Sequence, residues 1–200
     1  MSLLQPALFD APVRGPEGFR YQPNLLSPTQ AQDLLADLAD LDFKPFEFRG
    51  FLGKRHVASF GWRYDFNHAR LDPAAAIPSF LEPVRERAAA FAGLAPERLE
   101  QVLINRYEAG AGIGWHRDRP QFEDVVGVSL GAPGSLRFRR RQGSGWERMT
   151  IPVAPRSAYL LRGPSRRDWE HSLPEVEALR YSVTFRSFRA GLDPGGLEEI

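Results

Sequence analysis

After residue 93 the chain alternates short strand-like segments with turns, and this pattern limits the possible folds more than any other feature. Most of these segments are separated by glycine, proline or polar residues. We predict strands at residues 101–107, 113–117, 123–130, 135–141, 148–153, 157–162, 168–173 and 180–188. Eight short strands at this spacing are typical of a closed barrel or a jelly roll, architectures that leave few strand edges open.

Two amphipathic helices are predicted before these strands. Ser27 is a suitable N-cap for a helix with Pro28 in its first turn, and apolar residues follow at helical spacing at positions 31, 34, 35, 38 and 41. A second helix is expected from about Ser79 to Ala92. Both would cover one outer face of the strands. Residues 1–20 contain three prolines and no periodicity, so we expect an irregular arm there.

The segment 43–66, between the two helices, is rich in aromatic residues. Residues 56–66 are predicted to form a strand, and residues 44–53 a loop or a short hairpin. Lys54, Arg55 and Arg63 lie among the rings, a mixture that suits stacking on a flat base and contact with phosphates. Any single ring is as well explained as part of the core, but the segment as a whole is our candidate substrate lid.

Composition narrows the class of protein further. Two hundred residues fit one domain, and we expect residues 1–200 to form a single one. There is no cysteine, which excludes disulfides, thiolate metal sites and cysteine nucleophiles. No long apolar run predicts a membrane span, and the first residues do not resemble a signal peptide. We therefore expect a cytoplasmic protein without membrane association, and a monomer.

The formal net charge is only +1, but the positive charge is concentrated in the C-terminal half. Residues 137–189 contain twelve arginines and five acidic residues. One hypothesis is therefore a nucleic-acid-binding module that uses Arg137, Arg139, Arg140 and Arg141 on phosphates and carries no working metal site. Because strand side chains alternate, at most three of these four arginines can point the same way.

Three residues form a candidate metal site. His116 and Asp118 lie two positions apart and so project from one face of a strand, and His171 supplies a second imidazole. Two neutral imidazoles and one carboxylate are the ligand set of non-heme iron(II) oxygenases, which leaves metal positions open for chemistry. His-x-Asp alone occurs by chance in many chains, so the surrounding sequence has to support this interpretation.

The strand predicted around residues 180–186 alternates strictly. Arg180, Ser182, Thr184 and Arg186 share one face, and three apolar or aromatic residues share the other. A face turned to solvent would be an ordinary polar strand surface. If the face points into the barrel, two buried guanidinium groups need anionic partners, because an unpaired buried charge is costly. A dicarboxylate would provide both negative charges.

Taken together, these motifs resemble those of the AlkB-like iron(II)- and 2-oxoglutarate-dependent dioxygenases. They occur in the family's order and cover residues 102–188, with weaker similarity at 53–66. The matching stretches are Asn105-Arg106-Tyr107, Gly114-Trp115-His116-Arg117-Asp118, Val128-Ser129-Leu130-Gly131, Trp169-Glu170-His171-Ser172-Leu173-Pro174 and Arg180 to Arg186. The resemblance implies an α+β, mainly β fold: a double-stranded β-helix (jelly-roll) core at 101–188 with the N-terminal helices packed on one face.

The resemblance also implies roles for particular residues. His116, Asp118 and His171 would bind Fe(II), and Arg180 with Tyr107 would hold the distal carboxylate of 2-oxoglutarate. Arg186 and Asn105 would lie near the end of 2-oxoglutarate that chelates the metal. Ser182 stands where many relatives have Asn and still offers one hydrogen-bonding group to the co-substrate. With O2 as co-substrate, the family's chemistry hydroxylates a C–H bond, and on an N-methyl group this releases formaldehyde.

For the substrate, the leading hypothesis is oxidative demethylation of N-alkylated nucleobases in DNA or RNA, presented as single-stranded or flipped nucleic acid. The candidate substrate-binding residues are Arg55, Trp62, Tyr64, Phe66 and Glu123. Many nucleic-acid-demethylating members have an acidic residue where this chain has Pro120; Glu123 or Asp124 would have to replace it. The alternative is a 2-oxoglutarate-dependent hydroxylase or demethylase acting on a protein or a small molecule.

Overall fold

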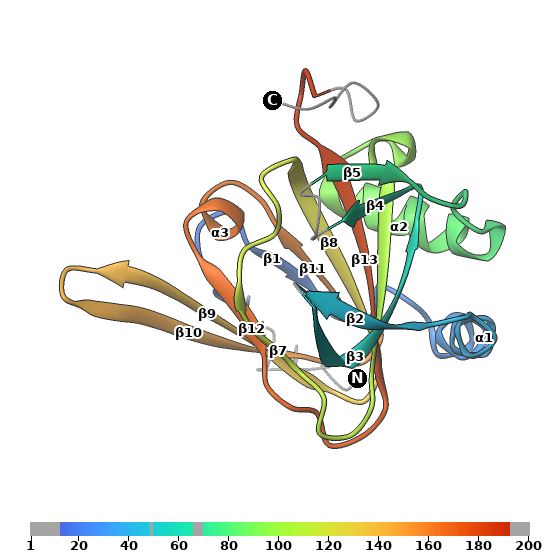
Figure 1. The fold of residues 1–200 in the computed structure, drawn as a ribbon, viewed down its shortest axis with the longest axis horizontal. Coiled ribbons are helices and arrows are strands. Elements are labelled where there is room, and N and C mark those ends of the chain that lie inside the picture. Colours follow the sequence, from blue (N-terminus) through green and yellow to red (C-terminus); the bar gives the residue numbers. More distant parts are fainter. Residues whose placement is uncertain (1–12, 49, 66–69, 193–200) are drawn as a thin grey trace, which may run out of the picture.

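A computed structural model describes residues 13–48, 50–65 and 70–192 and consists mainly of two antiparallel sheets (Figure 1). The larger sheet has seven strands in the order β1-β11-β8-β13-β6-β3-β2, and the smaller has four in the order β10-β9-β12-β7. The strands of these sheets are β1 Arg20–Gln22, β2 Lys44–Phe48, β3 Phe51–Phe60, β6 Gln101–Tyr107, β7 Ile113–His116, β8 Phe122–Gly131, β9 Gly134–Gln142, β10 Gly145–Val153, β11 Ala158–Leu161, β12 Glu170–Leu173 and β13 Arg180–Phe188.

The remaining elements lie around this pair of sheets. A small two-stranded sheet pairs β4 (Trp62–Asp65) with β5 (Arg70–Pro73). The helices are α1 Pro28–Ala39, α2 Glu82–Ala92 and α3 Pro164–Arg167, and short 3-10 turns occupy Ser79–Leu81 and Pro96–Arg98. Among the described segments, no helix has both the length and the apolar character needed to cross a bilayer.

The two longer helices cover the outer face of the larger sheet, as the sequence predicted. Ser27 and Gln30 form a capping box at the start of α1, and Gly93 ends α2 with φ of +71°. The apolar face of β13, with Tyr181, Val183 and Phe185, packs in one buried cluster with residues from both helices. Each large apolar side chain buried there contributes roughly 1.5–3 kcal/mol, so this layer fixes the sheet's outer face.

The smaller sheet lies against the opposite face of the larger one, which completes the double-sheet core. A second apolar cluster fills one end of the space between the sheets and includes Leu136, Phe138, Ile151, Leu161 and Trp169. The strand-rich composition and the two antiparallel sheets confirm the predicted α+β, mainly β jelly-roll class, with the N-terminal helices on one face.

β13 is the strand that positions most of the inner face. It is hydrogen-bonded on both sides, to β6 and to β8, over nearly its whole length. Arg180 lies opposite Tyr107 on one side and Gly131 on the other, and Ser182 lies opposite Asn105 and Ser129. A strand paired on both edges cannot slip without losing both ladders, so the inward positions of Arg180 to Arg186 are tightly specified.

Several predicted boundaries were wrong. The expected strand 56–66 is divided at Gly61 into β3 and β4, because Gly61 has φ of +73° and a Cβ there would lie 2.1 Å from the Glu100 carbonyl oxygen. The hairpin alternative for residues 44–53 is confirmed, because β2 pairs with β3, but β3 continues beyond this range to Phe60. The strand predicted from residue 168 starts at Glu170, since Pro164 favours the short helix α3 before it.

Two other predictions meet the structure only in part. Residues 1–12 of the expected irregular arm lie outside the described residues, and its last residue, Arg20, begins strand β1, which pairs with β11. Strand β10 starts at Gly145 rather than at residue 148, because Gly145 pairs with Gln142 close to the turn. The hairpin β9–β10 is consequently long, and it projects from the body of the protein (Figure 1).

Candidate functional site

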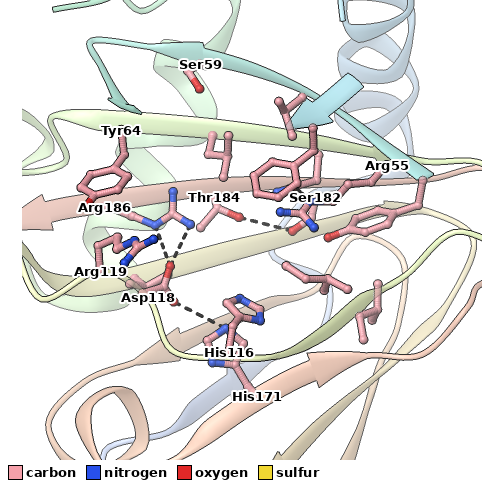
Figure 2. A pocket seen from close by; sticks show the side chains of 18 of the residues that line it. Arg55, Ser59, Tyr64, His116, Asp118, Arg119, His171, Ser182, Thr184 and Arg186 are labelled. Carbon is pink, nitrogen blue, oxygen red and sulfur yellow. Dashed lines mark hydrogen bonds and ion pairs between the residues drawn. The ribbon is translucent and has the colours of Figure 1, made fainter. Parts of the chain in front are cut away.

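A cavity of about 880 Å³ lies between the inner faces of the two sheets and opens beside the β2–β3 hairpin and β4 (Figure 2). Its inner wall is formed by alternate residues of β13 and β6, and its opposite wall by β7 and β12. The volume is in the range of ordinary small-molecule sites. All three predicted metal ligands and all five predicted co-substrate residues line it.

The three candidate metal ligands are brought together by strand pairing. His116 ends β7 and lies directly opposite His171 of β12, so the ring centroids are 4.2 Å apart. Asp118 follows two residues later, and its Oδ2 lies 3.5 Å from Nε2 of His171. Figure 2 shows Asp118 between this histidine pair and Arg186. The spacing of His116 and Asp118 is visible in the sequence, and the pairing of β7 with β12 adds His171.

The protonation states suit metal binding. Burial lowers the pKa of His116 and lowers that of His171 to about 3, so both imidazoles are neutral at pH 7. Burial works to raise the pKa of Asp118, but Arg186 and the two histidines hold it below its usual range, so the carboxylate is ionised. Nδ1 of His116 lies 2.9 Å from the Gly114 carbonyl oxygen. When Nδ1 carries the proton and donates a hydrogen bond to this oxygen, Nε2 keeps a lone pair that can bind a metal.

The three side chains are of the types that bind iron(II), but their donor atoms are not grouped around one point. Within the described part of the chain, no group of three or more His, Cys, Asp or Glu side chains is already arranged to hold an ion. Arg186 Nε and Nη2 lie 3.0 Å and 2.8 Å from Oδ1 of Asp118, and Asp118 Oδ2 lies on the side of His171. Nδ1 of His171 is also buried without a hydrogen-bond partner. Two neutral imidazoles and a carboxylate are nevertheless the iron(II) ligand set.

The polar face of β13 points into the cavity. Arg180 is 2% exposed, its Nη2 donates to Ser129 Oγ at 3.1 Å, and its guanidinium lies 5.5 Å from the ring centroid of Tyr107. Its Nε has no hydrogen-bond partner, and no described carboxylate forms an ion pair with it. A buried guanidinium without an acid is an incomplete pair, so this end of the cavity is suited to an anion.

Arg186 contacts the candidate metal ligand Asp118, and Asn105 lies opposite Ser182 on β6. Besides Asp118, Arg186 contacts Gln101, whose Oε1 accepts from Nη1 at 2.9 Å. Asn105 Oδ1 accepts a hydrogen bond from Arg55 Nε at 3.0 Å. Ser182 Oγ lies 3.4 Å from Thr184 Oγ1. The five predicted co-substrate residues therefore all lie on the inner face of β13 and β6, each with its own polar or cation–π contact.

The mouth of the cavity combines cations with aromatic rings. The guanidinium of Arg55 lies 3.6 Å from the ring centroid of Phe46, and that of Arg119 lies 4.6 Å from the centroid of Tyr64. All four side chains line the cavity, and Figure 2 shows Tyr64 and Arg119 close to Arg186. Of the predicted substrate residues, Arg55 and Tyr64 thus reach the site.

Two of the other predicted substrate residues, Trp62 and Glu123, do not reach it. Trp62 packs edge-on against Phe188 at 6.0 Å, in an apolar cluster beside the cavity. Glu123 pairs with Arg167 and Arg189 at 3.4 Å and 3.6 Å and does not line the cavity, so the expectation that it faces a base is not supported. Asp124 is buried in an ion pair with Arg162 at 2.6 Å. Phe66 lies outside the described residues.

A family model described as "2OG-Fe(II) oxygenase superfamily" matches residues 18–186. The chain belongs to this superfamily. The match includes both sheets, the three candidate metal ligands and the polar face of β13. Membership implies Fe(II), 2-oxoglutarate and O2 as cofactor and co-substrates, as the sequence predicted.

Curated relatives confirm the AlkB-like resemblance. The oxygenase is 28% identical over 211 residues to "Alkylated DNA repair protein ALKBH8 homolog" of Arabidopsis thaliana, with 92% of this chain and 58% of the relative covered. It is 32% identical over 140 residues to "DNA oxidative demethylase ALKBH2" of Homo sapiens, with coverages of 63% and 52%. The chain thus spans little more than half the length of these relatives.

Solved structures agree on the fold. The structure of OsALKBH1 superposes with a TM-score of 0.69 at 15% identity and covers 88% of this chain and 100% of that one. A prolyl-4-hydroxylase from Pseudomonas putida gives a TM-score of 0.57 at 18% identity, with coverages of 87% and 94%. At such identities the likeness extends to the fold alone.

The structure adds cavity residues of this oxygenase that the sequence did not single out. Tyr159 of β11, Arg119 and Phe46 line the cavity. Tyr159 lies in a strand whose four residues are all buried, so alternation along β11 gave no sign of which side faces the site. Arg119 directly follows the candidate ligand Asp118, and that proximity was the available signal.

Proposed function

We propose that this oxygenase is an Fe(II)- and 2-oxoglutarate-dependent dioxygenase that oxidatively removes alkyl groups from nucleobases. The observation that carries the proposal is the content of one cavity: two neutral histidines and an ionised aspartate at one place, and a buried arginine without an acidic partner at another. The names of AlkB-like relatives that act on alkylated DNA support the choice of a nucleobase.

The residues have distinct tasks in this proposal. His116, Asp118 and His171 would hold Fe(II), which when bound with 2-oxoglutarate and O2 supplies the oxidation of a substrate C–H bond and leaves succinate and carbon dioxide. Arg180 and Tyr107 would hold the distal carboxylate of 2-oxoglutarate. Hydroxylation of an N-methyl group gives a hemiaminal that releases formaldehyde, so the net reaction is demethylation.

The protein's own contribution is orientation and exclusion of water. Arg180, Ser182, Thr184 and Arg186 are all buried on a strand paired on both sides, so the groups that receive the co-substrate are fixed before it binds. The positive charge of Arg186 balances the Asp118 carboxylate and lowers its pKa, so Asp118 stays ionised. Aromatic walls at the mouth would keep bulk water from the reacting groups once a base is in place.

The mouth supports a flat substrate. Arg55 over Phe46 and Arg119 over Tyr64 present guanidinium planes and rings side by side. A base that has left its stack is recognised by stacking on such surfaces, and stacking contributes roughly 1–3 kcal/mol per base. The cationic groups would meet the neighbouring phosphates.

The outer face of the four-stranded sheet supports a polyanionic partner. Trp115 lies between Arg137 and Arg139, with guanidinium-to-centroid distances of 5.2 Å and 4.5 Å. Trp146 lies between Arg139 and Arg141 at 4.3 Å and 4.4 Å. This series begins at Trp115, which also lines the cavity, and runs out along the projecting hairpin, so a bound strand would meet alternating rings and cations.

The test is product release from defined oligonucleotides. Purified protein with Fe(II), 2-oxoglutarate and O2 is given single-stranded DNA or RNA that carries N-methylated bases, and the unmethylated sequence serves as the control. We expect formaldehyde and succinate to form together, and only with the methylated strand. Lack of stimulation by every methylated DNA and RNA would reject the nucleobase as substrate.

One observation favours a second candidate, a protein or small-molecule substrate. Pro120 occupies the position where nucleic-acid-demethylating relatives place an acid, and Glu123 and Asp124 are engaged in ion pairs away from the cavity. Succinate formation that depends on iron but on no nucleic acid would support this candidate. The third hypothesis, a binding module without catalysis, predicts no iron-dependent succinate at all.

A further inference from the structure

Tyr159 occupies an unusual position in the cavity wall. It pairs in register with Gly127 of β8, and Gly127 pairs on its other side with Thr184 of β13. A Cβ on Gly127 would lie 2.2 Å from Cζ and 2.4 Å from the hydroxyl oxygen of Tyr159. The tyrosine ring therefore lies directly across the backbone of Gly127, in space that any other residue at position 127 would fill.

This placement brings the hydroxyl of Tyr159 to the polar face of β13. Ser182 acts as a hydrogen-bonding partner of the Tyr159 side chain, and Arg180 lies within electrostatic range of it. All three residues line the cavity. Burial raises the pKa of Tyr159, so the phenol keeps its proton at neutral pH and can donate a hydrogen bond.

The Arg180 guanidinium has N–H groups that are not used in hydrogen bonds to described side chains. A guanidinium carries five N–H groups, and Arg180 has one hydrogen bond to a described side chain, to Ser129. A carboxylate accepts up to about four hydrogen bonds. Arg180 and Tyr107 would leave some of the carboxylate's lone pairs without a donor. The Tyr159 hydroxyl lies beside Ser182 in the same cavity and could supply one more donor.

We propose that Tyr159 forms the floor of the 2-oxoglutarate site: its hydroxyl donates to the distal carboxylate held by Arg180, and its ring sets the length of dicarboxylate that fits. The inference rests on the use of 2-oxoglutarate in the proposed function, and it does not depend on the identity of the alkylated substrate. Tyr159 is thus a co-substrate-binding and specificity-determining residue.

A purely structural role for Tyr159 makes different predictions. The ring also packs with Val125, Leu136 and Leu161, so its loss affects the second apolar cluster whatever the hydroxyl does. Tyr159→Phe keeps the ring and removes only the hydroxyl. Tyr159→Leu keeps apolar volume near the backbone and opens the floor. A structural role predicts lower stability without a change in preference between dicarboxylates.

The experiment measures binding rather than turnover. Calorimetric titrations use the full chain loaded with Mn(II) in place of iron, with 2-oxoglutarate and 2-oxoadipate, which is one methylene longer, as ligands. For Tyr159→Phe we expect 2-oxoglutarate to bind about tenfold more weakly, the equivalent of one hydrogen bond to a charged group. For Tyr159→Leu we expect the preference for 2-oxoglutarate over 2-oxoadipate to fall by about tenfold or to reverse.

Two further variants keep the result interpretable. Tyr21→Phe removes a hydroxyl that accepts from the Ala154 backbone N–H at 3.1 Å outside the cavity, and it should bind both ligands as the parent does. Gly127→Ala adds the methyl group that the ring excludes, so it should weaken 2-oxoglutarate even if Tyr159→Leu fails to fold. Circular dichroism and thermal unfolding report folding for each variant.

The outcomes separate the inference from the proposed function. If Tyr159→Phe binds 2-oxoglutarate as tightly as the parent, and either Tyr159→Leu keeps the parent's preference or Gly127→Ala keeps the parent's affinity for 2-oxoglutarate, the inference is overturned. If the parent itself binds no 2-oxoglutarate with Mn(II), the proposed co-substrate is wrong and the inference falls with it. If 2-oxoglutarate binds but no methylated oligonucleotide is turned over, only the substrate proposal fails.

Discussion

The deep end of the cavity and its mouth are built in opposite ways. At the deep end, Arg180, Ser182 and Tyr107 lie on central strands hydrogen-bonded on both edges, and all three are buried. At the mouth, β2 is the last strand of its sheet, and the hairpin it forms with β3 has an irregular register between Pro45 and Glu47. Residues 49 and 66–69 lie outside the described residues.

This difference suggests that the deep end binds the co-substrate and that the mouth selects the substrate. Groups on a doubly paired strand are held in place by the ladder, which suits chemistry that needs fixed geometry. An edge hairpin can change sequence and length at little cost to the sheet, which suits recognition of one substrate among many. Changes at the deep end should therefore act on the co-substrate, and changes in the aromatic rings of the mouth should act on the alkylated substrate.

The largest effect is expected from removing a metal ligand. His116→Ala leaves two protein ligands, so bound iron and succinate formation should both fall by at least roughly 100-fold. Anaerobic metal analysis and a 2-oxoglutarate decarboxylation assay measure the two. His56→Ala, a histidine of β3 that does not line this cavity, is the matched control and should retain both. Full iron binding in His116→Ala would contradict the assignment of the triad.

The next effect concerns the anion site at the deep end. Arg180→Met removes the only charged group proposed for the distal carboxylate, and charge-assisted hydrogen bonds contribute roughly 1.5–3 kcal/mol each. The apparent affinity for 2-oxoglutarate should fall by about 100-fold, while the content of bound iron stays close to that of the parent. Arg87→Met, on the exposed side of α2, controls for loss of an arginine. Unchanged affinity would place the co-substrate elsewhere.

A change at the mouth should reverse this pattern. Tyr64→Ala removes a ring that lines the cavity beneath Arg119, and loss of one stacking contact should raise KM for a methylated oligonucleotide by about tenfold. Affinity for 2-oxoglutarate, measured by titration, should not change. Tyr64→Phe keeps the ring and should behave as the parent. If Tyr64→Ala weakened 2-oxoglutarate instead, the separation of deep end and mouth would not hold.

The last effect concerns the pH-dependent stability of the metal-free protein. Because burial lowers the pKa of His171 to about 3, the unfolded chain binds this proton below about pH 6.5 and the folded chain does not. The free energy of unfolding should therefore fall as pH drops from 6.5 towards 4, by up to about 1.4 kcal/mol per pH unit for this group. Urea unfolding of the parent and of His171→Gln measures the difference, and equal slopes for both would contradict it.

Much of the deep end was predictable from local sequence. Strict alternation from Arg180 to Arg186 placed four polar groups on one face, and this inference holds because strand side chains have period two whatever surrounds them. His116 and Asp118 were expected on one face of a strand, but β7 ends at His116 and Asp118 follows the strand. The start of α1 at Ser27 and the end of α2 at Gly93 were also predictable, because helix capping depends on neighbouring residues in the sequence.

Only the tertiary structure decided which face of each strand meets the cavity and which residues meet across it. His171 joins His116 because β12 pairs with β7, Tyr159 reaches Ser182 because β8 has a glycine beneath the ring, and Glu123 and Trp62 turn away to other partners. Sequence periodicity determines which residues share a side of a strand. Register between distant strands depends on packing of the whole sheet, and no local pattern contains it.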